Sequence, residues 1–128
     1  MDLKGVKIYP SAHPVKETID RLQEFLQQHG ATIYTRIDQQ AEAQKAGQNL
    51  QPLEFIMFGN PKAGGPLMAE NPLVALDLPL KVIAWEDKEK KVWVAYNNAS
   101  YIEEKYNLSH NENSPLNLDP LISKLLGI

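Results

Sequence analysis

The stretch LKVIAWEDKEKKVWVAYN, residues 80–97, decides the fold class. Its two apolar runs, LKVIAWE and KVWVAY, are rich in the β-branched and aromatic residues that favour strands, and the polar DKEK between them is short. The pattern predicts a β-hairpin. Trp85 and Trp93 would then lie on facing strands, where aromatic cross-strand pairs stabilise a sheet.

The most regular helical pattern lies towards the N-terminus. Val15, Ile19, Leu22 and Leu26 follow one another at intervals of four, three and four residues, which places them on one face of a helix. Gly30 suits the left-handed position just after the end of this helix. We therefore expect the apolar face of the helix, Leu22 included, to lie in the hydrophobic core.

Further strands and helices complete the chain. Residues 6–9, 31–38 and 53–58 are short apolar runs typical of strands, and Asp38 is placed to cap a short helix that Gly47 ends. Asn97 or Asn98 would cap a helix over residues 99–106, and Asp119 would cap the last helix.

This order of elements indicates one α+β domain over residues 1–128, with a largely antiparallel sheet and helices packed on one face. The hairpin strands are apolar on both faces, and we expect Ile83 to join Leu22 in the core.

The segment FGNPKAGGPLM, residues 58–68, follows the strand at 53–58 and raises the main functional question. As a connecting loop it would have glycines at positive φ, with Asn60 bonded to its own backbone, and short helical pieces would begin at Pro66 and Pro72. As a binding loop it would offer backbone N–H groups and the charge of Lys62 to an anion, although its spacing matches neither common phosphate-binding fingerprint.

Composition excludes several classes of function. Apolar residues make up 43% and charged residues 23%, and the formal charge of −3 lacks the basic excess of a nucleic-acid-binding protein. Cysteine is absent, so thiol chemistry and zinc–thiolate sites are excluded. Neither a signal peptide nor a membrane-spanning run is evident, and we expect a cytoplasmic protein that binds no membrane.

We therefore expect a small-molecule-binding or anion-binding module near the segment 58–68, with no metal or other cofactor, because the three histidines lie far apart. The candidate ligand-binding residues are Asn60, Lys62, Gly64, Gly65, Asp38, Asp77 and Tyr96.

Two alternatives stay open, and the catalytic residues, if there are any, are unknown. In the first, the segment forms a homodimer interface that buries Phe58, Leu67 and Met68 between chains. In the second, the protein is an enzyme of the proton-transfer type, with a carboxylate or His13 as the base and Lys62 as its electrostatic partner. The residues favour a non-enzymatic role.

Five motifs make the chain resemble the DUF302 family. They are HPVKETIDRL, YTRID, FGNPKAGGPLMAENPLVALDLPLKV, WED and VWVAYN, and the resemblance runs from about Ser11 to Leu108. The resemblance implies a compact α+β domain of the TATA-box-binding-protein-like class, and members that pair as dimers. It implies no defined activity, and a fold by itself does not carry DNA binding with it. Gln39 stands where many members have a histidine.

Overall fold

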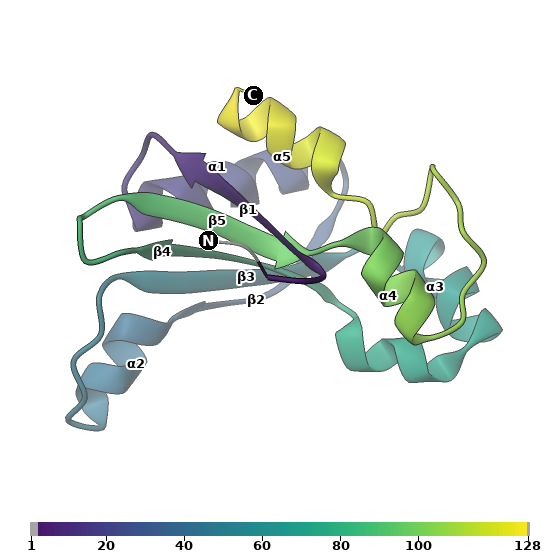
Figure 1. Ribbon diagram of the computed structural model, residues 1–128, viewed down its shortest axis with the longest axis horizontal. Coiled ribbons are helices and arrows are strands. Elements are labelled where there is room, and N and C mark those ends of the chain that lie inside the picture. Colours follow the sequence, from purple (N-terminus) through teal and green to yellow (C-terminus); the bar gives the residue numbers. More distant parts are fainter. Residues whose placement is uncertain (1–2, 128) are drawn as a thin grey trace.

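The computed structural model describes residues 3–127 and contains a five-stranded antiparallel sheet (Figure 1). The hairpin predicted at residues 80–97 forms the centre of this sheet, and its tryptophans Trp85 and Trp93 are cross-strand partners. The strand order across the sheet is β1 (Val6–Ser11), β5 (Val92–Asn97), β4 (Leu80–Glu86), β3 (Leu53–Gly59) and β2 (Thr32–Asp38).

The helices gather on one face and at the ends of the sheet. α1 (Val15–Gln28) crosses the strands β2, β3 and β4, and α5 (Asp119–Leu126) packs beside it on the same face (Figure 1). At one end of the sheet lie α3 (Pro61–Glu70), the 3-10 helix η1 (Pro72–Asp77) and α4 (Ala99–Lys105), whereas α2 (Gln39–Lys45) lies at the other end. The α+β class and the helices on one face are therefore confirmed.

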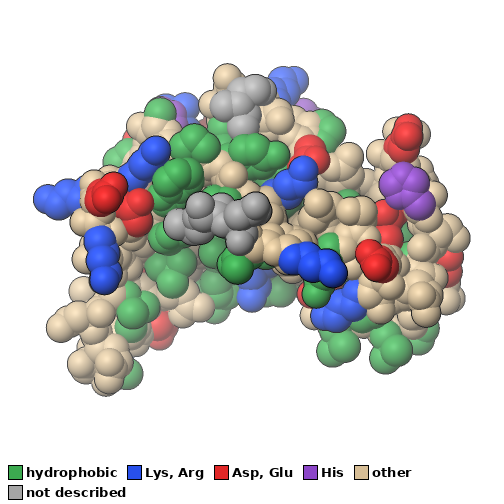
Figure 2. All heavy atoms as spheres, in the orientation of Figure 1, with side chains coloured by type: hydrophobic (Ala, Val, Ile, Leu, Met, Phe, Trp, Pro, Cys, Tyr) green, Lys and Arg blue, Asp and Glu red, His purple; other side chains and the backbone are tan. Residues whose placement is uncertain are grey.

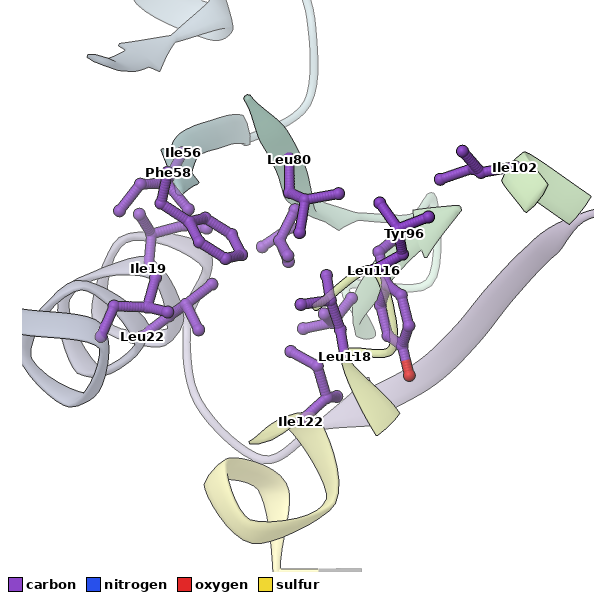
Figure 3. Close-up of a cluster of buried hydrophobic side chains, with 14 of the residues drawn as sticks. Ile19, Leu22, Ile56, Phe58, Leu80, Tyr96, Ile102, Leu116, Leu118 and Ile122 are labelled. Atoms are coloured by element: carbon purple, nitrogen blue, oxygen red, sulfur yellow. The ribbon is translucent and has the colours of Figure 1, made fainter. Parts of the chain in front are cut away.

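The hydrophobic core fills the space between the sheet and these helices. Figure 3 shows Ile19 and Leu22 of α1 pointing towards Ile56 and Phe58 of β3, and Leu22 is fully buried. Because side chains alternate along a strand, every second residue contributes to this core. The core members from the central strands are Ile56, Phe58, Leu80, Val82, Ala84, Val94 and Tyr96.

The same alternation places Ile83 outside the core. Its neighbours Val82 and Ala84 are fully buried against the helices, so Ile83 points to the opposite face of the sheet and is only partly buried. The expectation that Ile83 lies in the core was wrong, because a strand that is apolar on both faces does not reveal which face the helices cover. We call the sheet face opposite α1 the open face.

The helix caps follow the expected chemistry with one exception. The carboxylate of Asp38 accepts a hydrogen bond from the Ala41 N–H at the start of α2, and the Asn98 side chain caps α4. Asp119 does not cap α5. It is the first residue of that helix, and its carboxylate accepts a hydrogen bond from the Tyr96 hydroxyl at 2.5 Å instead.

Candidate functional site

A cavity of about 330 Å³ opens at the end of the sheet where β3 leads into α3. It is continuous with the hydrophobic core, since Leu26, Phe58, Leu80 and Leu116 belong to both. The rest of the lining comes from the end of α1, from β2, α3, the turn before β4 and the segment 115–121. These residues are His29, Ala31, Tyr34, Gly59, Asn60, Pro61, Ala63, Gly64, Leu67, Met68, Leu78, Pro79, Pro115 and Leu121.

The segment predicted as a glycine-rich loop is the first half of α3. The Asn60 side chain accepts a hydrogen bond from the Lys62 N–H at 3.0 Å, and Pro61 occupies the first turn, where its missing N–H costs nothing. The helix continues through Gly64 and Gly65, neither of which has a positive φ. The loop prediction was wrong because capping by Asn60 and Pro61 outweighs the low helix propensity of two glycines. The predicted bond from Asn60 to its own local backbone is confirmed.

This helix start has already used the N–H groups that an anion would need. The Asn60 carbonyl accepts from the N–H groups of Ala63 and Gly64, at 2.9 and 2.8 Å, and the Asn60 side chain accepts from Lys62. A phosphate-binding helix start leaves these donors pointing at its ligand. The geometry therefore favours an apolar ligand over an anion at this position.

Three polar side chains stand among the apolar walls: His29, Tyr34 and Asn60. The Nδ1 atom of His29 lies 2.8 Å from the Phe25 carbonyl oxygen, and its ring stacks on the Phe25 ring with centroids 4.2 Å apart. Because a carbonyl only accepts, Nδ1 carries the proton, and in the neutral ring Nε2 remains an acceptor. Tyr34 sits where the register of β2 against β3 shifts, and its side chain is exposed.

Of the four candidate residues on and beside α3, only Asn60 and Gly64 line the cavity. A Cβ at Gly64 would meet Leu78 and Met68 at ordinary contact distances, whereas one at Gly65 would meet nothing within 4 Å. Lys62 is exposed on the same helix and does not contribute to the lining.

The other three candidates lie elsewhere. Asp38 is at the opposite end of the β2–β3 ladder, since it pairs with Glu54 while Thr32 pairs with Gly59. Five residues of strand, about 17 Å, separate those two ends. Tyr96 is buried against Asp119, and burial together with that carboxylate raises the pKa of Tyr96, which keeps the hydroxyl protonated.

Asp77 lines a second, smaller hollow of about 150 Å³. Its carboxylate accepts hydrogen bonds from the Tyr106 hydroxyl and from Lys105 Nζ, the latter at 3.3 Å, so it ties η1 to α4. The turn Leu78–Pro79–Leu80 lines both this hollow and the 330 Å³ cavity. One short segment of backbone therefore separates two concave sites.

The residues named in the two alternatives are not gathered at one place. His13 lies before α1, 3.7 Å from Glu17, and is in a different place from both Asp38 and Asp77. Phe58 is buried in the core of a single chain with Leu67 packed against that core, so only Met68, which is 37% exposed, is left for contacts between chains. Across residues 3–127, no three His, Asp or Glu side chains form a cluster that could hold a metal.

Sequence reasoning missed most of the cavity wall. His29, Tyr34 and the turn 78–80 come from three distant parts of the chain, and only the fold brings them to α3. Tyr34 carries no visible signal, because a strand bulge has no composition cue in this sequence. Leu78 and Pro79 lie in the segment that leads into the hairpin. The sequence indicates no role for this segment beyond that of a connection.

Comparison with known proteins places the fold. A family model described as "Domain of unknown function DUF302" matches residues 7–125. A solved structure titled "Crystal structure of uncharacterized conserved protein DUF302 from Bacillus stearothermophilus" superposes with a TM-score of 0.73 at 19% identity, covering 98% of this chain and 89% of that one. At this identity, the likeness shows a shared fold.

The curated relatives are longer proteins that are named as fluoride-specific ion channels. "Fluoride-specific ion channel FluC 1" of Brucella suis and "Fluoride-specific ion channel FluC 2" of Brucella melitensis are each 38% identical to this chain over 104 residues. The matched part is 81% of this chain but only 41% and 38% of those proteins, so the chain spans about two fifths of their length. None of the helices described within residues 3–127 is long and apolar enough to cross a membrane.

Proposed function

This chain belongs to the DUF302 family, and we propose that it is a small-molecule-binding protein whose ligand occupies the 330 Å³ cavity beside α3. The observation that carries the proposal is the combination of an apolar wall continuous with the core and a few polar side chains at one place. Binding sites for small molecules typically have this composition, and this volume falls at the lower end of their range.

The proposed ligand is small, largely apolar and uncharged. Lys62 does not line the cavity, and the first N–H groups of α3 bond to Asn60, so no group on α3 is left to neutralise a negative charge there. His29 and Tyr34 supply a hydrogen-bond acceptor and a hydroxyl with which such a molecule would be oriented. Its apolar part would lie between Leu67, Leu78 and Phe58.

A matched pair of helix variants tests this proposal. Ala63→Leu adds a side chain to the cavity wall, whereas Ala69→Leu makes the same change at an exposed position of α3 outside the lining. Ligand-observed NMR with a panel of neutral aromatic and aliphatic compounds should find binders of the wild type. Ala63→Leu should weaken them at least tenfold, and Ala69→Leu should leave them unchanged.

Two other results would reject the proposal. Equal weakening by both variants would place the ligand outside the cavity, and no binder for the wild type would mean that the cavity takes no ligand of this class. Lys62→Ala checks the charge assignment. Loss of binding on removal of this exposed lysine would restore the anion hypothesis.

A second function is favoured by the names of the relatives. Because two proteins named as fluoride channels contain a region 38% identical to this chain, we propose that the chain can act together with a fluoride channel as a separate polypeptide. Co-expression with the fluoride channel of the same genome should give a complex that survives affinity purification. Deletion of the chain should then alter resistance to fluoride, and an unchanged resistance with no complex would reject this role.

A further inference from the structure

The open face of the sheet carries a row of apolar side chains that crosses all five strands. Cross-strand pairing places Ile37 of β2, Phe55 of β3, Ile83 of β4, Ala95 of β5 and Ile8 of β1 side by side on this face. None of the five belongs to the core cluster that packs against α1 and α5. Phe55 and Ala95 are already buried within one chain, whereas Ile8, Ile37 and Ile83 are only partly buried and keep apolar surface on this face.

A second row lies next to the first. It contains Leu53, Trp85, Trp93 and Pro10, which are neighbours across β3, β4, β5 and β1. Both tryptophans of the protein are therefore on the open face. Tryptophan is a residue type enriched at the centres of protein interfaces, where it contributes strongly to binding.

The open face carries few charged side chains, and the lysines on it lie against aromatic rings. Lys81 lies two residues before Ile83 on β4, and its ammonium lies 4.5 Å from the centroid of the Phe55 ring. At the margin, Lys91 covers the Trp93 ring in the same way at 4.6 Å. These lysines shield the rings from water in an isolated chain and can swing out towards a rim when another surface arrives.

The face is concave and bordered by an exposed leucine. Figure 2 shows the hollowed outline beneath the strands, with hydrophobic side chains along it, between the lobe of α2 and the lobe of α3 and η1. Leu76 of η1 lines the 150 Å³ hollow together with Met57, Lys81 and Asn97, which lie on or at the edge of this face. Its side chain is 78% exposed, so a single chain gives it almost no partner.

The size of the face matches a second copy of this chain. Five strands about 4.8 Å apart and six residues long at about 3.3 Å each give roughly 500 Å² per copy, so two copies would bury about 1,000 Å² before η1 is included. That is about the area a specific interface needs. An uncharged apolar row is also self-complementary, as a two-fold interface requires.

We propose that the open face is the surface on which a second copy of this chain packs, sheet against sheet, with Ile83 at the centre and Leu76 at the margin. β4 is the middle strand of the five, so the two-fold axis passes close to Ile83. Two sheets packed face to face lie about 10 Å apart with their side chains interdigitated. The cavity beside α3 involves the opposite face of the sheet, so this inference stands independently of the proposed ligand.

Analytical ultracentrifugation over a concentration series tests the interface. The wild type should form a dimer, and Leu76→Lys and Ile83→Lys should each raise the dimer dissociation constant at least tenfold. Leu76 is so exposed that its replacement leaves the fold of one chain intact, and circular dichroism checks this for both variants. Met68→Lys is the matched control, because Met68 is an exposed helical residue beside the other cavity.

The tryptophans give a second readout that reports on this face alone. Dilution of the wild-type dimer should shift their emission to longer wavelength and increase quenching by acrylamide, and both lysine variants should resemble the diluted state throughout. A wild type that stays monomeric into the millimolar range would overturn the proposal. So would a dimer weakened only by Met68→Lys, or one whose tryptophans are quenched as easily as those of the monomer.

Discussion

Glu54 is a buried acid on the sheet face that α1 covers, and it shows how one ion pair anchors a helix. Its carboxylate accepts hydrogen bonds from Arg36, which also contacts Asp20 of α1 at 2.6 Å and the Gln23 side chain at 3.1 Å. Burial alone would lower the pKa of Arg36, but its hydrogen bonds with these carboxylates outweigh that effect and raise it. The group therefore holds α1 against β2 and β3 as a charged network.

Removal of the Glu54 side chain should cost much more than removal of a surface acid. Glu54→Ala removes the buried carboxylate partner of Arg36 and leaves it only the half-exposed Asp20, and we expect a loss of about 3 kcal/mol in the free energy of unfolding. Glu17→Ala breaks an exposed pair with Arg21 and should cost about 0.5 kcal/mol. Urea unfolding measures both, and equal losses would mean that the network does not anchor α1.

Asp87 makes the hairpin sensitive to acid. The Trp93 indole N–H and the Lys91 backbone N–H donate to its carboxylate, and together they lower the pKa of Asp87. A lowered pKa in the folded state stabilises the protein above the ordinary value of about 4, and this stabilisation is lost as the pH falls through the folded pKa. The stability advantage of the wild type over Asp87→Asn should therefore be present at neutral pH and shrink on acidification. A gap that is constant with pH would contradict this assignment.

At the scale of the element, β4 shows why an apolar strand conceals its orientation. LKVIAWE reads as apolar throughout, yet Val82 and Ala84 are fully buried while Ile83 lies on the open face. If helices covered both faces of the sheet, the side chains on the two faces of β4 would have equivalent surroundings. Here the sheet has helices on one face only, so the two sets have different surroundings.

This difference predicts unequal effects of the same truncation. Leu22→Ala removes a fully buried side chain and should cost about 3 kcal/mol. Ile83→Ala should cost about 1 kcal/mol when measured at dilutions where the chain is monomeric, because part of that side chain already contacts water. Chemical denaturation followed by circular dichroism measures both, and a larger loss at Ile83 would reverse the assignment of the two faces.

The two central glycines of α3 should respond differently to alanine. Gly64→Ala should stabilise the protein by about 0.5–1 kcal/mol, because the added methyl group meets only ordinary contacts and alanine favours a helix. Gly65 precedes Pro66, whose ring clashes with a Cβ on the preceding residue in a helix. Gly65→Ala should therefore give no gain, although the space around it is open. Thermal unfolding of the two variants compares them directly.

For the whole molecule, the sequence predicted the elements well and their assembly only in part. The hairpin, the apolar stripe of α1 and the cap at Asp38 rest on local patterns, and all three are confirmed. The cavity depends on contacts between α1, β2, α3 and the segment 115–121, which no local pattern encodes. The prediction at Gly64 and Gly65 was wrong because glycine is compatible with a loop, whereas the capping by Asn60 and Pro61 favours a helix there.

The turn Leu78–Pro79–Leu80 forms a wall of both the ligand cavity and the hollow beside the open face. A ligand that displaced this shared wall would change the shape of both hollows. Occupancy of the proposed site and the proposed association of two chains would then be thermodynamically linked, and reciprocity would require each to alter the other by the same factor. A ligand that favours the paired form would bind more tightly as the protein concentration rises, so that the abundance of the protein would itself set its sensitivity.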